Sequence, residues 1–269
     1  MEKQKTVGNP VFSREKIISL CKKNVIPQLM LLEETESTNT LAKRLAEDGN
    51  IPDEGIIIAA ERQTAGRGRL GRSFLSDGRG LYFSYLFRPN GSPEENLRIT
   101  PYAAVAMARA IDSVCGTRVG IKWVNDLYLG GKKLAGILTE GGFDEKGAPR
   151  YAIVGIGVNI SHRELPEELC HIATDLEKET GRRFDKNLIL SAFIDEFDPD
   201  DILSTEACNE YRERSVILGK CVRVESGGES YEAEAYHITD NCELLVKTQM
   251  GETKRLFTGE VSVRFTNQN

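Results

Sequence analysis

The sequence predicts an α+β protein, in which a mixed and largely antiparallel sheet is flanked by helices and followed by a small all-β unit. Up to about residue 216, apolar segments of strand length are interspersed with segments of helical spacing, which is typical of a sheet covered by helices. From residue 219, short segments of strand character separated by turn residues indicate a β-barrel or sandwich. The 269 residues suffice for one large and one small domain. We therefore expect an N-terminal extension at 1–30, a large domain at 31–216 and a small domain at 217–269.

The first predicted elements are two helices with a short strand between them. Ser13 is suited to cap the first helix, and residues 30–32 have strand character. Ser37 or Thr38 can cap the second helix, which Gly49 closes. A plain helix cap would by itself account for these hydroxyl residues.

The central elements are strands and one helix. Residues 55–60 and 81–87 have the apolar character of buried strands. Thr100 and Pro101 mark the start of an alanine-rich helix, as a cap and a first-turn proline, and such a helix can pack closely on a sheet.

A hairpin and a third buried strand follow. A strand at 121–124 ends in a turn at 125–126, and two consecutive glycines at 130–131 join the flanking strands into a hairpin. Residues 151–160 form a strand whose glycines indicate a close approach to the backbone. The remaining helical patterns cover 165–182, 187–197 and 205–213, and the C-terminal strands cover 222–224, 231–235, 243–247, 253–257 and 261–265.

The composition is that of a soluble globular protein. Hydrophobic residues make up 40% and charged residues 28%, no apolar run is long enough to span a bilayer, and no signal-type core follows the N-terminus. The net charge of −6 argues against broad nucleic-acid binding, which requires a basic face. None of the six cysteines forms a C-x-x-C pair, and the three histidines do not cluster with them. We predict a cytoplasmic protein with scattered reduced thiols.

A loop at 66–72 stands out, because three glycines and three arginines alternate in it almost without interruption. The glycines permit backbone conformations that are closed to other residues, and guanidinium groups suit phosphate and carboxylate oxygens. The loop follows the strand at 55–60, so we expect it to hold an anionic small molecule.

Two familiar phosphate-binding motifs partly match this loop. Its glycines fit G-x-G-x-x-G, and the segment nearly fits a P-loop with Arg72 in place of lysine. Both motifs require a helix that begins at the glycines, whereas residues 73–80 are rich in turn formers. A solvated basic loop is the remaining alternative, and it does not account for the tight alternation.

Polar clusters lie beside several predicted strand ends, at 37–39, at Gln63 with the loop, at 122–133 and at Asn159. A sheet that gathers such groups on one face makes a small-molecule site. No serine, cysteine or histidine has the partners of a nucleophile–base pair, which favours a reaction between two bound substrates. Cations from the loop and Lys133 would offset the repulsion between a carboxylate and a phosphate.

These motifs together resemble the biotin protein ligases, also called biotin–[acetyl-CoA-carboxylase] ligases. The matching segments, in order, are 36–39, 66–72, 122–126, 133–140 and 155–159. Each is weak alone, but five in the right order are specific. Val124, where the family often has proline, is a departure that should alter only local rigidity. The resemblance implies a class II synthetase-like catalytic domain, a C-terminal SH3-like domain and compatibility with a homodimer.

The resemblance implies a two-step reaction. Biotin and ATP, with Mg²⁺, give biotinyl-5′-adenylate and pyrophosphate, and a lysine of a biotin carboxyl carrier protein then takes the biotin and releases AMP. The implied biotin-binding residues are Ser37, Thr38, Asn39, Gln63, Gly66, Arg67, Arg69, Lys133 and Gly136. The implied ATP- and adenylate-binding residues are Arg67, Arg69, Arg72, Trp123, Asn125, Lys133 and Asn159.

Three residues would be catalytic. Lys133 and Arg69 would stabilise the charge on carboxylate and α-phosphate, and Asp126 would orient or deprotonate the attacking lysine. The magnesium ligands are not identified. Core packing would also account for Trp123, a plain turn for Asn125 and Asp126, and a strand end for Asn159.

Two other functions compete with this one. A lipoate or octanoate protein ligase or transferase shares the expected fold, although the arginine-rich loop and the segment at 122–126 favour biotin. A DNA-binding repressor of biotin genes would need a helix-turn-helix domain of about three helices before residue 37, where only one convincing helix is predicted.

Overall fold

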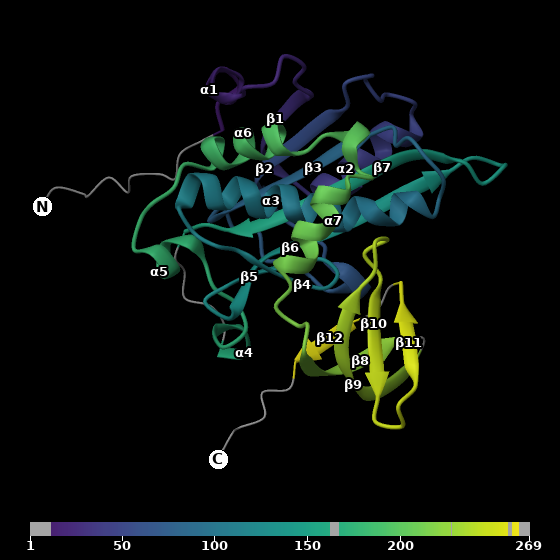
Figure 1. Cartoon of the computed structure of the whole chain (residues 1–269). Helices are drawn as coiled ribbons and strands as arrows, with labels where there is room; N and C mark the ends of the chain where they lie inside the picture. Colours follow the sequence, from purple (N-terminus) through teal and green to yellow (C-terminus); the bar gives the residue numbers. More distant parts are fainter. Residues whose placement is uncertain (1–11, 162–166, 227, 258–259, 264–269) are drawn as a thin grey trace, which may run out of the picture.

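The large domain is built on a seven-stranded sheet of order β1-β2-β3-β7-β6-β5-β4 (Figure 1). The computed structural model describes residues 12–161, 167–226, 228–257 and 260–263. β1 and β2 pair in parallel, and all other neighbouring strands are antiparallel, which confirms the mixed sheet. The strands are β1 (Gln28–Thr35), β2 (Ile56–Gln63), β3 (Gly80–Phe87), β4 (Gly120–Lys122), β5 (Asp126–Leu129), β6 (Lys132–Phe143) and β7 (Pro149–Asn159).

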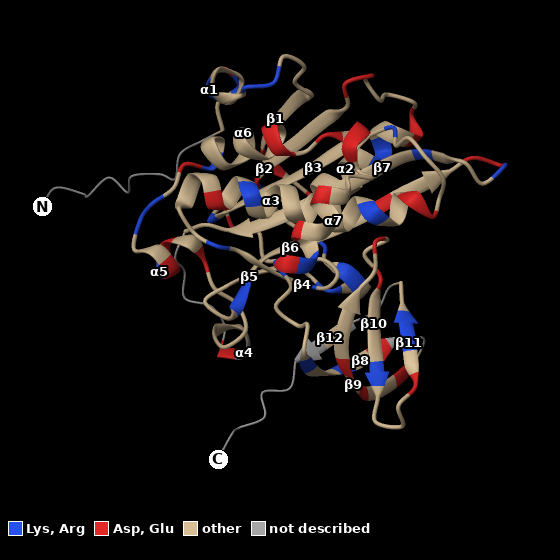
Figure 2. Cartoon of the chain, viewed as in Figure 1, with Lys and Arg blue, Asp and Glu red and all other residues tan. Residues whose placement is uncertain are grey.

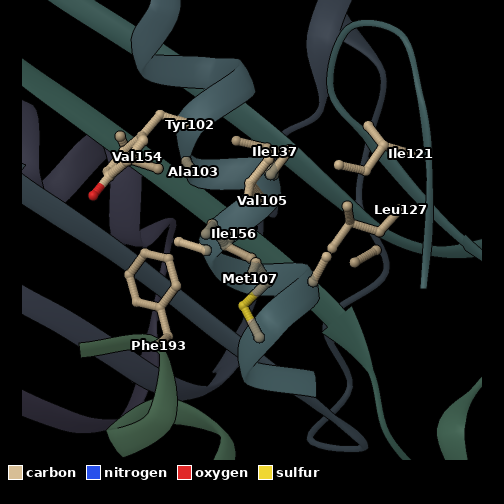
Figure 3. Close-up of a cluster of buried hydrophobic side chains, with 14 of the residues drawn as sticks. Tyr102, Ala103, Val105, Met107, Ile121, Leu127, Ile137, Val154, Ile156 and Phe193 are labelled. Carbon is tan, nitrogen blue, oxygen red and sulfur yellow. The ribbon is translucent and has the colours of Figure 1, made fainter. Parts of the chain in front are cut away.

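Helices cover both faces of this sheet. Ile56 and Ile58 of β2 face α2 (Thr38–Glu47), where they pack with Ala42 and Ala46. The alternate residues of the strand face the main core, which α3 (Ile99–Cys115) and α6 (Lys186–Glu196) cover. Figure 3 shows Val105 and Met107 of α3 against this face of the sheet and near Phe193 of α6. The run of alanines in α3 is what lets its backbone approach the strands.

Local signals place most of the helix starts. Ser13 caps α1 (Arg14–Leu20) through the backbone N–H of Lys16, and Ser37 caps α2 through that of Thr40, as predicted.

The prediction that Thr100 caps α3 was wrong. The short helix η2 (Glu95–Arg98) runs directly into α3, so Arg98 is the cap residue. The Thr100 hydroxyl instead donates to the Thr139 hydroxyl on β6, at 2.7 Å.

Two predicted elements are shorter than expected. The helical pattern at 165–182 is divided, within its described part, into α4 (Glu167–Cys170) and α5 (Leu176–Thr180). Between these two helices, Ala173 forms an isolated β-bridge with Lys133 of β6. This extended pairing competes with a continuous helix. The strand at 121–124 ends at Lys122, and the peptide bond between Trp123 and Val124 is cis.

The C-terminal region forms a separate antiparallel sheet of order β11-β10-β9-β8-β12, consistent with the predicted SH3-like unit. Its strands are β8 (Lys220–Ser226), β9 (Glu229–Ile238), β10 (Leu244–Thr248), β11 (Thr253–Leu256) and β12 (Glu260–Val263). η3 (Pro199–Asp201) and α7 (Thr205–Glu213) precede this sheet, which lies below the large domain in Figure 1. Trp123 donates its indole N–H to the carbonyl of Cys242 at 3.0 Å, so the two domains are in contact.

Candidate active site

Two adjoining cavities open where β1, β2 and β7 end and where β3, β5 and β6 begin. The smaller has a volume of about 50 Å³ and the larger about 370 Å³. The residues that line both are Gly68, Arg69, Phe74, Asn125 and Lys133. The cavities are therefore two compartments of one site, and the shared residues, two of them cationic, form their boundary.

The smaller compartment lies at the N-terminus of α2, and hydrogen bonds fix the polar groups in it. The Gln63 side-chain carbonyl accepts the backbone N–H of Thr38 at 2.9 Å and lies 3.2 Å from the Thr38 hydroxyl. The Gln63 amide nitrogen donates to the Ser76 hydroxyl at 2.8 Å. These contacts set the orientation of the Gln63 amide, which leaves its second N–H available to a ligand.

Asn39 is held from several sides by the protein itself. Its amide nitrogen donates to Glu140 at 2.7 Å and to the Leu138 carbonyl at 3.2 Å, and its oxygen accepts from Ser84 at 2.6 Å. A Cβ on Gly155 would lie 1.9 Å from this oxygen, so only glycine fits there. The main role of Asn39 in this structure is to shape the compartment wall.

The loop at 66–72 lies over the boundary between the compartments as a small hairpin. Gly68 N–H donates to the Arg72 carbonyl at 2.7 Å, and Phe74 N–H to the Gly66 carbonyl at 2.8 Å. At the tip, Leu70 has φ 56° and Gly71 has φ 74°, a pair of left-handed conformations that closes the turn. Helix α3 begins only at Ile99, after β3, so the dinucleotide-fingerprint and P-loop interpretations are wrong.

The arginines of this loop reach different parts of the site. Arg67 lines the smaller compartment and pairs with Glu140 at 3.6 Å. Arg69 lines both compartments and donates to the Asn125 side-chain oxygen at 3.0 Å. Arg72 lines the larger compartment. The loop therefore delivers positive charge along the whole length of the site.

Lys133 projects into the boundary from the start of β6. Its ammonium lies 2.7 Å from Asp126 Oδ1 on the neighbouring strand β5, and its side chain is 36% exposed. A Cβ on Gly136 would come within 3.3 Å of Lys133 Nζ, so glycine leaves room for this ammonium. The adjacent Lys132 points elsewhere, because its ammonium donates to the Cys170 carbonyl at 2.9 Å.

The larger compartment has aromatic and apolar walls. Trp123 and Asn159 both line it, and Asn159 donates to the Thr174 carbonyl at 3.0 Å. Tyr128 lies beneath the Lys122 ammonium, which is 5.7 Å from the ring centroid. Burial, with a smaller contribution from Asp126, raises the pKa of Tyr128 to about 12, so its hydroxyl stays a neutral hydrogen-bonding group at physiological pH. Val261 of the small domain completes the wall.

The sequence predicts fourteen site residues, and thirteen of them lie on the walls of these compartments. Gly66 is the exception: it is buried at the base of the loop, where a Cβ would lie 2.4 Å from the Phe74 carbonyl oxygen. Sequence reasoning missed Phe74, Glu140 and Ser84. Ser84 carries a usable signal, because it is the one serine in a strand of otherwise apolar and aromatic residues, and it is fully buried.

No three potential ligands among histidine, cysteine, aspartate and glutamate come together as a metal site in the described part of the chain. Among the residues that the structure describes, Asp126 is the one carboxylate on the walls of the two compartments. None of the helices in the described ranges has the length and apolarity needed to cross a membrane.

Comparison with known proteins gives a consistent result for both domains. Residues 31–159 match the model of the Biotin/lipoate A/B protein ligase family, and residues 217–264 match the Biotin protein ligase C terminal domain. The chain is 31% identical to the Bifunctional ligase/repressor BirA of Bacillus spizizenii, over 90% of this chain and 76% of that protein. It is 30% identical to the Biotin–[acetyl-CoA-carboxylase] ligase of Mycobacterium tuberculosis, over 87% of this chain and 88% of that protein.

Solved structures are similar over nearly the same length. The biotin protein ligase of Aquifex aeolicus in complex with biotin and ATP superposes with a TM-score of 0.73 at 30% identity, over 88% of this chain and 98% of that chain. The Leishmania major ligase with biotinyl-5-AMP has a TM-score of 0.59 at 23% identity, over 86% of this chain and 98% of that chain, and supports the fold alone.

Proposed function

The chain belongs to the biotin protein ligases, and on that premise we propose that it joins biotin to ATP as biotinyl-5′-adenylate and transfers biotin to a lysine of a biotin carboxyl carrier domain. One observation carries the proposal: two compartments of unequal size meet at Lys133 and Arg69. The small one suits the compact ureido head of biotin, and the large one suits a nucleotide.

In the first step the biotin carboxylate attacks the α-phosphorus of ATP, forms the mixed anhydride and expels pyrophosphate. The Thr38 hydroxyl and the Gln63 amide are suited to the ureido group, which needs both donors and acceptors. Biotin placed in this way directs its carboxylate toward the shared boundary. There Lys133 and Arg69 offset the repulsion between the carboxylate and the α-phosphate and stabilise the charge that develops on the leaving pyrophosphate.

The loop then has to move to admit biotin. A cavity of about 50 Å³ has room for only about three or four water molecules. Biotin is larger than this, so we propose that the hairpin at 66–72 opens on entry and closes over the reactants. Closure brings Arg67 and Arg72 to the anionic groups and excludes water that would hydrolyse the adenylate.

Magnesium enters this proposal as the counterion of ATP. Mg²⁺ keeps several of its waters and is commonly held by substrate phosphates with one or two carboxylates. Within the described ranges, Asp126 is the one carboxylate on the compartment walls, and it already pairs with Lys133. The described residues thus suit an ion carried by the phosphates better than one in a protein cage, and no step here depends on it.

In the second step the carrier lysine attacks the acyl carbon and AMP leaves. We propose that Asp126 acts in both steps, by orienting Lys133 in the first and by accepting the proton of the attacking amine in the second. Asp126→Asn should therefore slow pyrophosphate release as well as transfer from preformed adenylate. A variant that is slowed in transfer alone would mean that the contact with Lys133 does not matter for the first step.

A direct assay tests the whole proposal. The chain is incubated with ATP, Mg²⁺, biotin and a biotin carboxyl carrier domain, and the carrier is analysed by mass spectrometry. One biotin on one lysine is expected. Lipoate and octanoate are tested in parallel, because the matching family includes lipoate ligases. Modification with lipoate and not biotin would overturn the assignment.

The domain division belongs to the same proposal. We propose that residues 31–216 hold biotin and ATP, that 217–269 serve as a C-terminal module, and that 1–30 are an N-terminal extension, whose helix α1 packs on the large domain through buried Ile17. β1 begins at Gln28, so the last residues of that extension also contribute to the sheet. The expected lack of a nucleic-acid partner and the possible homodimer stay predictions. Figure 2 shows acidic and basic residues interspersed over the visible face of the large domain.

A further inference from the structure

Two cysteines lie together where the two domains meet. Cys208 on α7 and Cys242 in the turn between β9 and β10 have sulfur atoms 3.3 Å apart. Both residues are buried, with 3% and 5% of their surfaces exposed. The sequence predicts scattered thiols, because these two cysteines are 34 positions apart and no C-x-x-C spacing links them. The pair exists only because the small domain packs on α7.

The surrounding contacts hold these two sulfur atoms in place. In its neutral form the Cys208 thiol donates to the carbonyls of Thr239 and Asp240, at 3.5 and 3.2 Å, in the same turn as Cys242. Arg212 Nη2 lies 3.7 Å from Cys208 Sγ. The Cys242 carbonyl in turn accepts the indole N–H of Trp123 at 3.0 Å. Each cysteine is thus fixed by its own domain and by the other.

We propose that Cys208 and Cys242 form an oxidisable dithiol site, which a small peroxide converts into a disulfide bridge across the domain junction. The inference does not rest on the proposed ligase activity. In the net reaction two thiols and one hydrogen peroxide give one disulfide and two waters, so the two sulfurs lose the two electrons that the peroxide gains.

Cys208 is the residue that attacks the peroxide. The hydrogen bond from the Cys242 thiol lowers the pKa of Cys208 to about 6; burial opposes this shift, and Arg212 and Arg98 add to it. The same hydrogen bond and burial raise the pKa of Cys242. At neutral pH the nucleophilic thiolate is therefore on Cys208.

The bonds change in two steps. The Cys208 sulfur forms a bond to one peroxide oxygen, the O–O bond breaks, and the departing hydroxide takes the Cys242 proton. The Cys242 sulfur then attacks the Cys208 sulfenic acid, the S–S bond forms, and the S–O bond breaks to release a second hydroxide, which solvent protonates.

Burial determines which oxidants can reach this site. Together with Arg98, Tyr102 and Ser204, the two sulfurs line a crevice whose free volume is about 0 Å³, so an oxidant reaches them only when the domain junction opens locally, and a small molecule requires the smallest opening. A small peroxide is therefore favoured over a bulky disulfide reagent. By contrast, Cys221 on β8 is exposed and open to both.

Peptide mapping of the full chain tests the proposal. The folded protein is treated with hydrogen peroxide, alkylated with iodoacetamide in denaturant and digested with trypsin without reduction. Cys208 and Cys242 fall in different tryptic peptides, 187–212 and 224–247, each with a single cysteine. We expect these peptides to be recovered joined, with the intact mass lower by two hydrogen atoms. Recovery of both peptides alkylated, or equal cross-linking in urea-unfolded protein, would overturn the proposal.

Fluorescence gives a second readout, because Trp123 is the only tryptophan and contacts the Cys242 backbone. Oxidation should quench its emission, and dithiothreitol should restore it. The matched variants are Cys208→Ser, which should abolish both the quenching and the joined peptides, and Cys221→Ser, which should retain both. Quenching that persists in Cys208→Ser would show that the signal does not come from this disulfide.

Discussion

Lys133 lines both compartments and lies at their boundary. Its ammonium forms an ion pair with Asp126 at 2.7 Å, so positive charge lies at the boundary before any substrate arrives. Preorganised charge of this kind is the commonest large contribution to catalysis, because the protein does not reorganise as the reaction proceeds.

Lys133→Ala should fold normally, retain biotin binding and lose most adenylate synthesis. Loss of one preorganised donor costs roughly 3–4 kcal/mol, or a few hundred-fold in rate. The measurement is pyrophosphate release, with thermal melting as a check on the fold.

Lys132→Ala is the matched control, since Lys132 bonds the Cys170 carbonyl and lines neither compartment. It should keep nearly full activity. Equal losses in the two variants would mean that Lys133 contributes only surface charge.

Glu140 makes two contacts that different substitutions can separate. One carboxylate oxygen accepts from Asn39 at 2.7 Å, and the other pairs with Arg67 of the loop at 3.6 Å. Glutamine at this position can still accept the hydrogen bond but carries no charge for Arg67.

Glu140→Gln should therefore leave thermal stability unchanged and speed the release of biotinyl-adenylate. Arg67 is half-exposed, and such ion pairs contribute at most about 1 kcal/mol, so we expect at most a roughly five-fold effect. Glu140→Ala should also lower stability, because it removes an acceptor of the Asn39 amide. An unchanged release rate in both variants would exclude a role for Glu140 in holding the loop.

At the scale of elements, the loop at 66–72 is a hairpin anchored at its base and exposed at its tip. Leu70 at the tip is 75% exposed, whereas bridges at Arg67–Ser73 and Gln63–Ser76 close the base. Glycines and mutually repelling arginines predict a loop with little structure of its own, but the backbone hydrogen bonds show that one conformation is available to it.

Limited proteolysis checks whether this hairpin closes on substrates. Trypsin can cut after its arginines, and the rate of cutting should fall at least several-fold when biotin and ATP are added together. The physical reason is that bound anions pair with the arginines and hold the tip down. Cutting at sites outside 66–72 provides the internal control, and equal rates with and without substrates would contradict closure.

At the scale of the whole molecule, an ionic network joins α3 to α7, the helix that leads to the small domain. Glu210 on α7 pairs with Arg109 of α3 at 2.6 Å and with Arg214 at 2.6 Å, and Arg214 also pairs with Asp112 of α3 at 2.7 Å. Partial burial raises the pKa of Glu210, but the hydrogen bonds from Arg109 and Arg214 outweigh it and hold the pKa below the usual 4.5.

This lowered pKa predicts acid sensitivity. The stability that ionised Glu210 contributes is fully present above pH 4.5, the value in the unfolded chain, and is lost as the pH falls through the lower folded value. Thermal melts of wild type should therefore show a decline below pH 4.5 that is smaller in Glu210→Gln.

At pH 7 the Glu210→Gln variant should be less stable by about 3 kcal/mol, because it leaves buried Arg214 without one of its charged partners. Glu196→Gln is the control, since Glu196 also pairs with Arg109 but is 36% exposed and should cost less than about 1 kcal/mol. Equal effects from the two variants would show that burial of the network is unimportant.

Features that depend on neighbouring residues could be predicted from the sequence. Strand and helix patterns gave the order of the elements, and local caps at Ser13 and Ser37 placed helix starts within a residue. The motifs at 37–39, 66–72 and 133–140 identified the residues that line the site, because each lies at a strand or helix end where side chains turn toward one edge of the sheet.

Contacts between residues distant in the chain depend on how the elements pack, and they could not be predicted from the sequence. The Asn39–Glu140 and Lys133–Asp126 contacts, the wall supplied by Val261 and the sulfur contact of Cys208 with Cys242 all join separate elements. Helix and strand periodicity says which face of an element is buried, but not which other element covers it. Here the small domain packs on α7, and this packing brings Cys208 and Cys242 into contact.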